Sequence, residues 1–172
     1  SIKQAAEFGI AKTNKKLAGL LLYITDVHSI GLETAQGLVL VSPFYWDMNE
    51  GTRKFSERFS AQKSGGAKPT MVQAGVYSSI IHYLKSVENI GSPQDGIKIV
   101  EKMKELPTED PLFGKGVIRI DGRKMHPMHL FEVKKPSESK YPWDYYSYKA
   151  STPAEAAFRS IEEGNCSLAM KK

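Results

Sequence analysis

The stretch LAGLLLYITDVHSIGLETAQGLVLV, residues 17–41, decides the fold class. It begins with the uninterrupted apolar run Leu20–Ile24 and ends with a second run over Leu38–Val41. Runs of this kind are typical of strands that are covered on both faces, as in the parallel sheets of α/β proteins. The segment between the two runs is mainly polar. We therefore predict an α/β fold in which two buried strands are separated by a short polar segment.

Asp26 follows the first predicted strand directly. In parallel α/β sheets, ligands bind where the carboxyl ends of the strands open into loops, which favours a ligand-binding role for this carboxylate. Aspartate is also a favoured N-cap residue, and Glu33 or Gln36 lies downstream, so Asp26 is also expected to cap a short helix. The two roles are compatible.

Length and composition indicate an ordinary globular chain. Of its 172 residues, 41% are hydrophobic and 25% are charged, which is typical of soluble domains. The length suits one domain or parts of two smaller lobes. No apolar run reaches the length of a transmembrane helix. The net charge of +5 is spread along the chain without a nucleic-acid-binding motif, so we expect no nucleic-acid partner. Cys166 is the single cysteine, and it is either a free thiol or a partner for a cysteine outside the chain.

Helical periodicity and turn residues predict the remaining elements. Ser92 and Pro93 suit the N-cap and N1 positions of a helix. Asp121-Gly122 is a strong hairpin turn, and Pro127 makes the returning arm an edge strand or a bent one. The expected helices are 2–8, 50–62, 70–90, 92–106 and 154–161, the expected hairpin is 115–133, and the expected loops are 63–69 and 108–114.

Some residue patterns point weakly to enzyme or metal chemistry. Asp26, His28 and Ser29 are the residue types of a hydrolytic triad, but residues so close in sequence rarely reach triad geometry. A hydrolytic enzyme that uses Asp26 and His28 is therefore the alternative to a binding protein. His126 and His129 could bind a soft metal, although in a strand they point to opposite faces. We expect no metal, no cofactor and no catalysis.

The C-terminal section is rich in aromatic residues. It contains the segment KYPWDYYSYK, residues 140–149, in a polar setting. We expect a tail that lies along the protein surface, with stacking on a ligand as the alternative. The aromatic residues concerned are Tyr141, Trp143, Tyr145, Tyr146 and Tyr148.

The order of these motifs resembles the C-terminal half of a type I periplasmic solute-binding protein. The nearest likeness is to the receptors of branched-chain amino-acid-type ABC transporters. The motifs that carry the resemblance are KQAAEFGI, LAGLLLYITDVHSIG, QGLVLV, VQAGVYSSIIHYLKSV, GVIRIDGRKMHPMHLFEVKKP and the tail YPWDYY. They cover nearly the whole chain.

The resemblance implies a partial type I fold, with Rossmann-like α/β/α lobes that are incomplete in this chain. Family members have two lobes joined by three crossovers, with the ligand in the cleft between them. Residues 1–42 would then end the α/β series of the C-terminal lobe. Residues 43–123 would belong to the N-terminal lobe, and residues 124–172 would return to the C-terminal lobe and form the tail.

The resemblance also implies a function and a set of site residues. The protein would capture a small organic solute, such as an amino acid, an amide or an aromatic acid, and present it to the membrane permease of an ABC importer. It would be secreted to the periplasm. Asp26 falls where amino-acid-binding members hold the ligand ammonium with an acidic residue. Thr25 and His28 would add polar contacts, and Tyr77 or Trp46 an apolar wall.

An oligomeric state is expected from the long helix. Its apolar residues would face a sheet that the resemblance places outside this chain. Large exposed apolar patches rarely survive on monomers, so we expect a homo-oligomer with an incomplete cleft. The residues concerned are Val72, Val76, Ile80, Tyr83 and Leu84.

Overall fold

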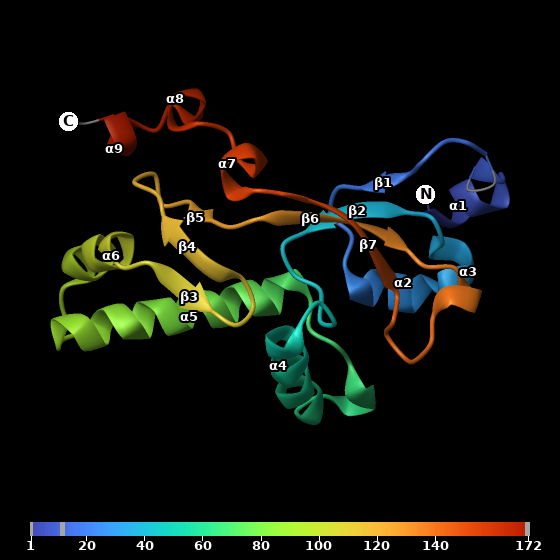
Figure 1. Cartoon of the computed structure of the whole chain (residues 1–172), viewed down its shortest axis with the longest axis horizontal. Helices are drawn as coiled ribbons and strands as arrows, with labels where there is room; N and C mark the ends of the chain where they lie inside the picture. The colour runs from blue at the N-terminus through green and yellow to red at the C-terminus, as the bar shows by residue number, and fades with distance from the viewer. Residues whose placement is uncertain (1, 11–12, 171–172) are drawn as a thin grey trace. The chain divides into compact units, whose positions relative to one another are not determined.

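The computed structural model describes residues 2–10 and 13–170, which form helices and short strands (Figure 1). The strands are β1 (Ala18–Gly19), β2 (Val39–Ser42), β3 (Thr108–Asp110), β4 (Gly114–Ile118), β5 (Lys124–Met125), β6 (Met128–Val133) and β7 (Tyr146–Thr152). The helices are α1 (Ile2–Glu7), α2 (Ile24–Ile30), α3 (Leu32–Ala35), α4 (Glu50–Ala61), α5 (Met71–Ile90), α6 (Gly96–Glu105), α7 (Ala154–Ala157), α8 (Ile161–Gly164) and α9 (Ser167–Met170), with 3₁₀ turns η2 (Ser64–Gly66) and η3 (Pro136–Glu138).

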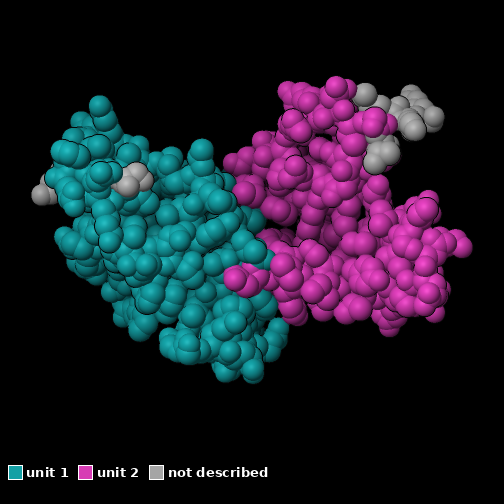
Figure 2. Space-filling model, turned by 180° about the vertical axis from the view of Figure 1, so that it is seen from behind, with its two compact units in different colours: residues 1–72, 129–151 teal, residues 73–128, 152–172 magenta. Residues whose placement is uncertain are grey.

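The chain forms two compact units, each built from two separate stretches (Figure 2). Unit 1 contains residues 1–72 and 129–151, and unit 2 contains residues 73–128 and 152–172. The predicted lobe boundaries, at residues 42 and 123, remain a prediction.

Unit 1 is a four-stranded sheet in the order β1-β2-β6-β7, with α2 and α3 against one face (Figure 1). β1 and β2 are parallel, and β2 and β6 are antiparallel with Leu40 opposite Phe131. The core joins Val27 of α2 to these strands. The other face is open, because Val41 of β2 is 50% exposed. The second apolar run is therefore a strand as predicted, but the prediction that both its faces are covered is wrong for this chain.

The prediction of a buried strand over residues 20–24 is also wrong. β1 ends at Gly19, and Leu20 is 98% exposed. The side chain of Leu22 folds back over Gly19, so closely that a Cβ on Gly19 would lie 2.7 Å from the Cβ of Leu22. This turn takes the backbone out of the sheet, and α2 begins at Ile24.

Unit 2 packs α5 and α6 beside the sheet β3-β4-β5 (Figure 1). The hairpin turn at Asp121-Gly122 is confirmed, since β4 and β5 are antiparallel with Val117 opposite Met125. The returning arm breaks after Met125, and β6 instead pairs with β2. The break contains Pro127, as predicted, because proline has no N–H to donate to a neighbouring strand.

Two other local predictions about unit 2 are wrong. Residues 108–110 form β3 rather than part of a loop, because Thr108 pairs with Gly116 of β4. The cap of α6 is Asp95 rather than Ser92, since the Asp95 carboxylate accepts hydrogen bonds from the amides of Ile97 and Lys98 at 3.2 and 3.1 Å. A carboxylate aimed at these free amides is a strong N-cap.

The predicted helices that begin near residues 2, 50 and 70 are confirmed as α1, α4 and α5. In the C-terminal section, the expected helix over residues 154–161 is two short helices, α7 and α8. The expected surface tail is partly wrong, because Trp143 and Tyr146 are buried in the core of unit 1, only 7% and 6% exposed.

The long helix α5 buries small or polar residues and exposes large apolar ones. Its buried residues are Ala74, Ser78, His82 and Ser86, spaced four apart. The predicted apolar stripe is exposed, with Val76, Ile80 and Leu84 each more than half accessible. The helix is therefore amphipathic, but its more apolar side is uncovered.

Candidate functional site

A small hollow in unit 1 lies at the carboxyl ends of the parallel strands β1 and β2. Its free volume is about 10 Å³, the room of a single water. Ligands of α/β proteins bind outside this edge of the sheet. The lining residues follow the two strands or lie at Pro69–Met71 and the start of β7: Leu22, Tyr23, Ile24, Leu40, Ser42, Phe44, Tyr45, Pro69, Thr70, Met71 and Tyr146.

The hydroxyl of Tyr146 is the unusual group in this lining. It is buried and, among the described residues, has no hydrogen-bond partner. Burial raises its pKa, and the charges of Tyr45 and Asp26 add to the increase. A buried hydroxyl without a partner costs free energy. Tyr146 is therefore able to bind a polar ligand atom or a water in the hollow.

The neighbouring Tyr45 hydroxyl is fully used. It donates to the Trp143 carbonyl at 3.1 Å and accepts from the Tyr145 amide at 3.2 Å. Burial raises the pKa of Tyr45 as well, although hydrogen bonds with the backbone of Tyr146 and Tyr145 lower it in part. The Tyr45 hydroxyl therefore holds the wall of the hollow in place, while the Tyr146 hydroxyl still has no hydrogen-bond partner among the described residues.

Asp26 lies beside the hollow on the first turn of α2. Its Oδ2 accepts a hydrogen bond from the Tyr23 amide at 2.8 Å, and Tyr23 lines the hollow. Asp26 therefore caps α2 from the N3 position rather than from the N-cap. The side chain is exposed, so one carboxylate can cap the helix and meet a ligand. Its role as a ligand anchor stays a prediction.

His28 and Trp46 both contact Trp143. The His28 ring stacks on Trp143 at 3.9 Å, and its Nδ1 lies 2.7 Å from the Tyr145 hydroxyl. Trp46 donates from Nε1 to the Trp143 carbonyl at 2.9 Å. Neither residue lines the hollow. These contacts tie the aromatic segment after β6 to α2.

The other two predicted site residues lie elsewhere. Thr25 is exposed on α2, next to Asp26. Tyr77 is half-buried on the part of α5 that belongs to unit 2. The sequence reasoning missed Tyr23, Phe44 and Tyr45 in the hollow. Phe44 and Tyr45 had a signal, since they are aromatic residues directly after a strand end.

The hydrolytic alternative receives no support from this geometry. Asp26 is engaged by the Tyr23 amide, and His28 by Tyr145 and Trp143. Within the described residues, no hydrogen bond joins His28 to Asp26 or Ser29. The described part of the chain also holds no group of three or more His, Cys, Asp or Glu side chains that could bind a metal.

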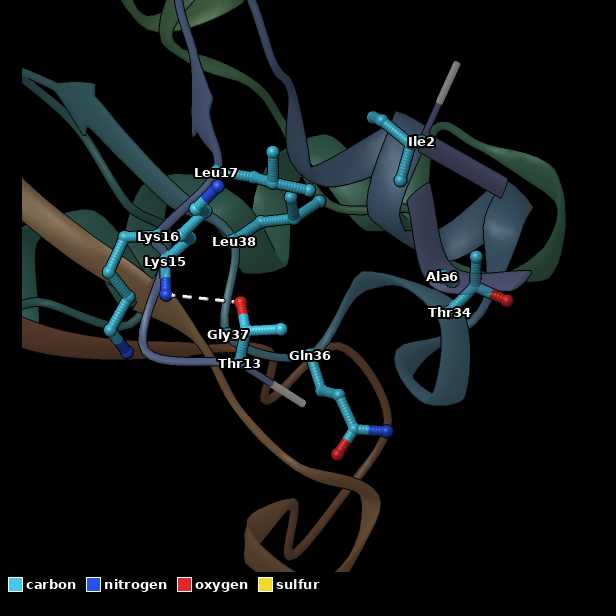
Figure 3. Close-up of a pocket in the computed structure, with 10 residues that line it drawn as sticks. All are labelled: Ile2, Ala6, Thr13, Lys15, Lys16, Leu17, Thr34, Gln36, Gly37 and Leu38. Atoms are coloured by element: carbon cyan, nitrogen blue, oxygen red, sulfur yellow. Dashed lines mark hydrogen bonds between the residues drawn. The ribbon is translucent and has the colours of Figure 1, made fainter. Parts of the chain in front are cut away.

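A second hollow lies at the amino ends of the same strands (Figure 3). Leu17 before β1 and Leu38 before β2 line it, together with Ile2 of α1. The Lys15 amide donates to the Thr13 hydroxyl at 3.2 Å in its wall. Its volume is about 50 Å³. Because ligands of α/β sheets bind at the opposite edge, this hollow is a weaker candidate.

Comparison with known proteins identifies the family. The family model described as periplasmic binding protein matches residues 1–140. The chain belongs to the periplasmic binding protein family. A crystal structure of a periplasmic binding protein from Burkholderia mallei is 47% identical over 97% of this chain, with a TM-score of 0.87. The search of curated proteins found no match.

Further solved structures show the same type I fold. A branched chain amino acid ABC transporter periplasmic ligand-binding protein from Burkholderia xenovorans LB400 is 39% identical over 98% of this chain, with a TM-score of 0.87. A solute binding protein of an ABC transporter from Rhodopseudomonas palustris BisB5, in complex with 3,4-dihydroxy benzoic acid, is 22% identical over 89% of this chain, with a TM-score of 0.72. The chain spans 43%, 44% and 41% of the lengths of these three proteins.

The periplasmic binding protein family thus accounts for the α/β architecture, although the chain covers less than half of each relative. None of the helices in the described part combines the length and apolar character needed to cross a membrane.

Proposed function

We propose that this chain is part of a solute-binding receptor of an ABC importer, which works in the periplasm and delivers a small organic solute to a membrane permease. The observation that carries the proposal is the 39–47% identity, over nearly the whole chain, to a periplasmic binding protein and an ABC transporter ligand-binding protein. The proposal includes no catalytic step and no cofactor.

The hollow of unit 1 suits one side of such a site. It is mainly apolar and aromatic and has few polar groups, as small-molecule sites usually do. In the proposal, the Tyr146 hydroxyl donates to a carboxylate or carbonyl oxygen of the solute. The Asp26 carboxylate, with Thr25 beside it, pairs with an ammonium or amide N–H. Tyr77 would supply an apolar wall for the solute.

A thermal-shift screen of the whole protein tests the proposal. Amino acids, short amides and aromatic acids are the solutes to include. A ligand at a hundredfold excess over its Kd stabilises the folded state by roughly 2.7 kcal/mol, which is readily visible as a rise in Tm. A folded protein that responds to none of these classes, but turns over ester or amide substrates, would overturn the receptor assignment.

The role of Asp26 is tested by Asp26→Asn, measured by calorimetric titration. Asparagine keeps an oxygen that can accept the Tyr23 amide but loses the negative charge. Affinity for solutes with an ammonium group should fall at least tenfold, while affinity for acids without one should change little. Glu33→Gln on α3 is the matched control, since Glu33 is also exposed and near a helix start. Equal effects of the two variants would show that only net charge matters.

The proposal also covers the oligomeric state. The apolar stripe of α5 is exposed in this chain, and exposed apolar patches promote association. We propose that the chain by itself forms a homo-oligomer, most simply a two-fold dimer.

A further inference from the structure

A basic cavity in unit 2 plays no part in the function proposed above. It lies between the β4–β5 hairpin and the C-terminal segment that contains α7 and α8, and its volume is about 410 Å³. That size lies within the roughly 300–1,000 Å³ of typical small-molecule sites. The hairpin contributes Arg119, Asp121, Arg123 and Lys124, and the C-terminal segment contributes Arg159 and Cys166.

Two of its four cationic side chains are already paired. Arg119 binds Asp121 through both carboxylate oxygens, at 3.0 and 2.6 Å, and this hydrogen bonding lowers the pKa of Asp121 to about 2. Lys124 pairs with Asp110 at 3.0 Å. Arg119 also donates to the main-chain carbonyl of Arg159 at 3.0 Å, which holds the C-terminal segment against the hairpin.

The other two cations have no acidic partner among the described residues. The Arg123 guanidinium lies over the ring of Phe158, 5.1 Å from its centroid, and Arg159 is exposed without a side-chain hydrogen bond. His126 also lines the cavity, but burial lowers its pKa, as do the charges of Lys124 and Arg123, so it is neutral at pH 7. After the pairs with Asp121 and Asp110, the wall therefore keeps two cations, Arg123 and Arg159, without an acidic partner in the described part of the chain.

We propose that this cavity binds a small anion with at least two charged oxygens, either a phosphate group or a dicarboxylate. Guanidinium groups match such oxygens with paired, charge-assisted hydrogen bonds. Phe158 restrains the Arg123 guanidinium, and the Arg119 contact restrains the segment that carries Arg159. The Arg123 guanidinium and the backbone that carries Arg159 are thus partly preorganised, which lowers the entropic cost of binding. The site is independent of the solute hollow in unit 1.

Calorimetric titration at low ionic strength tests the proposal, with inorganic phosphate and succinate as probes and chloride as the reference anion. We expect one binding event per chain with phosphate or succinate, and the preferred probe identifies the ligand class. Arg123→Gln and Arg159→Gln should each weaken it at least tenfold. Lys54→Gln on α4 removes the same charge from an exposed residue of unit 1 and should change affinity less than twofold. Unchanged thermal transitions show that the variants are folded.

The thiol of Cys166 reports the location of binding, because it lines the cavity. Saturating phosphate or succinate should slow its alkylation by iodoacetamide several-fold in the wild type, but not in Arg159→Gln. The proposal is overturned if neither probe binds, if Lys54→Gln weakens binding as much as the arginine variants, or if bound anion leaves the alkylation rate unchanged.

Discussion

At the scale of single residues, Asp110 is a hydrogen-bonded carboxylate of unit 2 with a buried side chain. Its side chain is 4% exposed and accepts hydrogen bonds from Ser78, at 2.6 Å, and from Lys124. Burial raises the pKa of Asp110, but four hydrogen bonds lower it by more, so the net pKa lies below its usual value. The donors are the Ser78 hydroxyl, the Phe113 and Leu112 amides and Lys124.

The lowered pKa of Asp110 predicts acid sensitivity. Its stabilising contribution is fully present above the unfolded-state pKa of about 3.9 and is lost as the pH falls through the lower folded-state value. Asp110→Asn should remove this part of the pH dependence and destabilise the chain at pH 7 by about 3 kcal/mol, as for other broken buried pairs. Urea unfolding between neutral and acidic pH measures both effects. An unchanged acid slope in the variant would contradict the assignment.

Tyr146 gives a second prediction at this scale. Because its buried hydroxyl lacks a partner among the described residues, Tyr146→Phe should leave the unliganded fold as stable as the wild type, or stabilise it by roughly 1 kcal/mol. Tyr45→Phe is the control, since its hydroxyl makes two hydrogen bonds, and it should destabilise by about 1 kcal/mol. Urea midpoints compare the two. A larger loss for Tyr146→Phe would indicate a hydrogen-bonded hydroxyl.

At the scale of elements, the strands of unit 2 are held close by Gly116. A Cβ there would lie 2.4 Å from the Met125 carbonyl oxygen and 2.9 Å from the Thr108 hydroxyl. Gly116→Ala should therefore separate β4 from its neighbours and cost about 1–3 kcal/mol. Gly75→Ala, in the interior of α5 with open space around it, should stabilise by about 0.5–1 kcal/mol. Thermal unfolding of both variants tests the contrast; similar shifts would contradict it.

Elements with local signals were predictable from the sequence, and elements that depend on distant partners were not. α4 and α5 follow from periodicity over many residues. The run Leu20–Ile24 looks like a buried strand, but the packing of Leu22 on Gly19 and the Asp26–Tyr23 hydrogen bond turn it out of the sheet. β3 exists because of its pairing with β4, which no local pattern shows.

The residues of the candidate site also differ in whether a local sequence pattern predicts them. Asp26 was predicted from its position after an apolar run, and its carboxylate bonds the amide of Tyr23, which lines the hollow, although the strand ends earlier than expected; its ligand role stays a prediction. Tyr146 was placed in a surface tail because its burial depends on contacts with Tyr45 and Phe131, far away in the sequence. Burial of this kind cannot be read from neighbouring residues.

At the scale of the whole molecule, the uncovered face of α5 predicts association. Ile80 and Leu84 are each 52% exposed one turn apart. Multi-angle light scattering of the 172-residue chain should therefore show a homo-oligomer. Ile80→Lys combined with Leu84→Lys should shift it toward the monomer, while Lys85→Ala should not.

The opposite result has a clear meaning. A monodisperse wild-type monomer with a single cooperative thermal transition would show that the chain tolerates this exposed stripe without a partner. The proposed homo-oligomer would then be wrong, while the solute-binding proposal would stand on its own tests.

The interleaving of the two units also has a consequence for timing. β2 ends at Ser42, but its antiparallel neighbour β6 begins only at Met128. At about 5–20 residues per second, a ribosome needs roughly 4 to 17 seconds to make the chain between them. During that interval the apolar residues of β2 lack the strand that shields their edge. For those seconds, the unpaired edge of β2 is open to association with other chains.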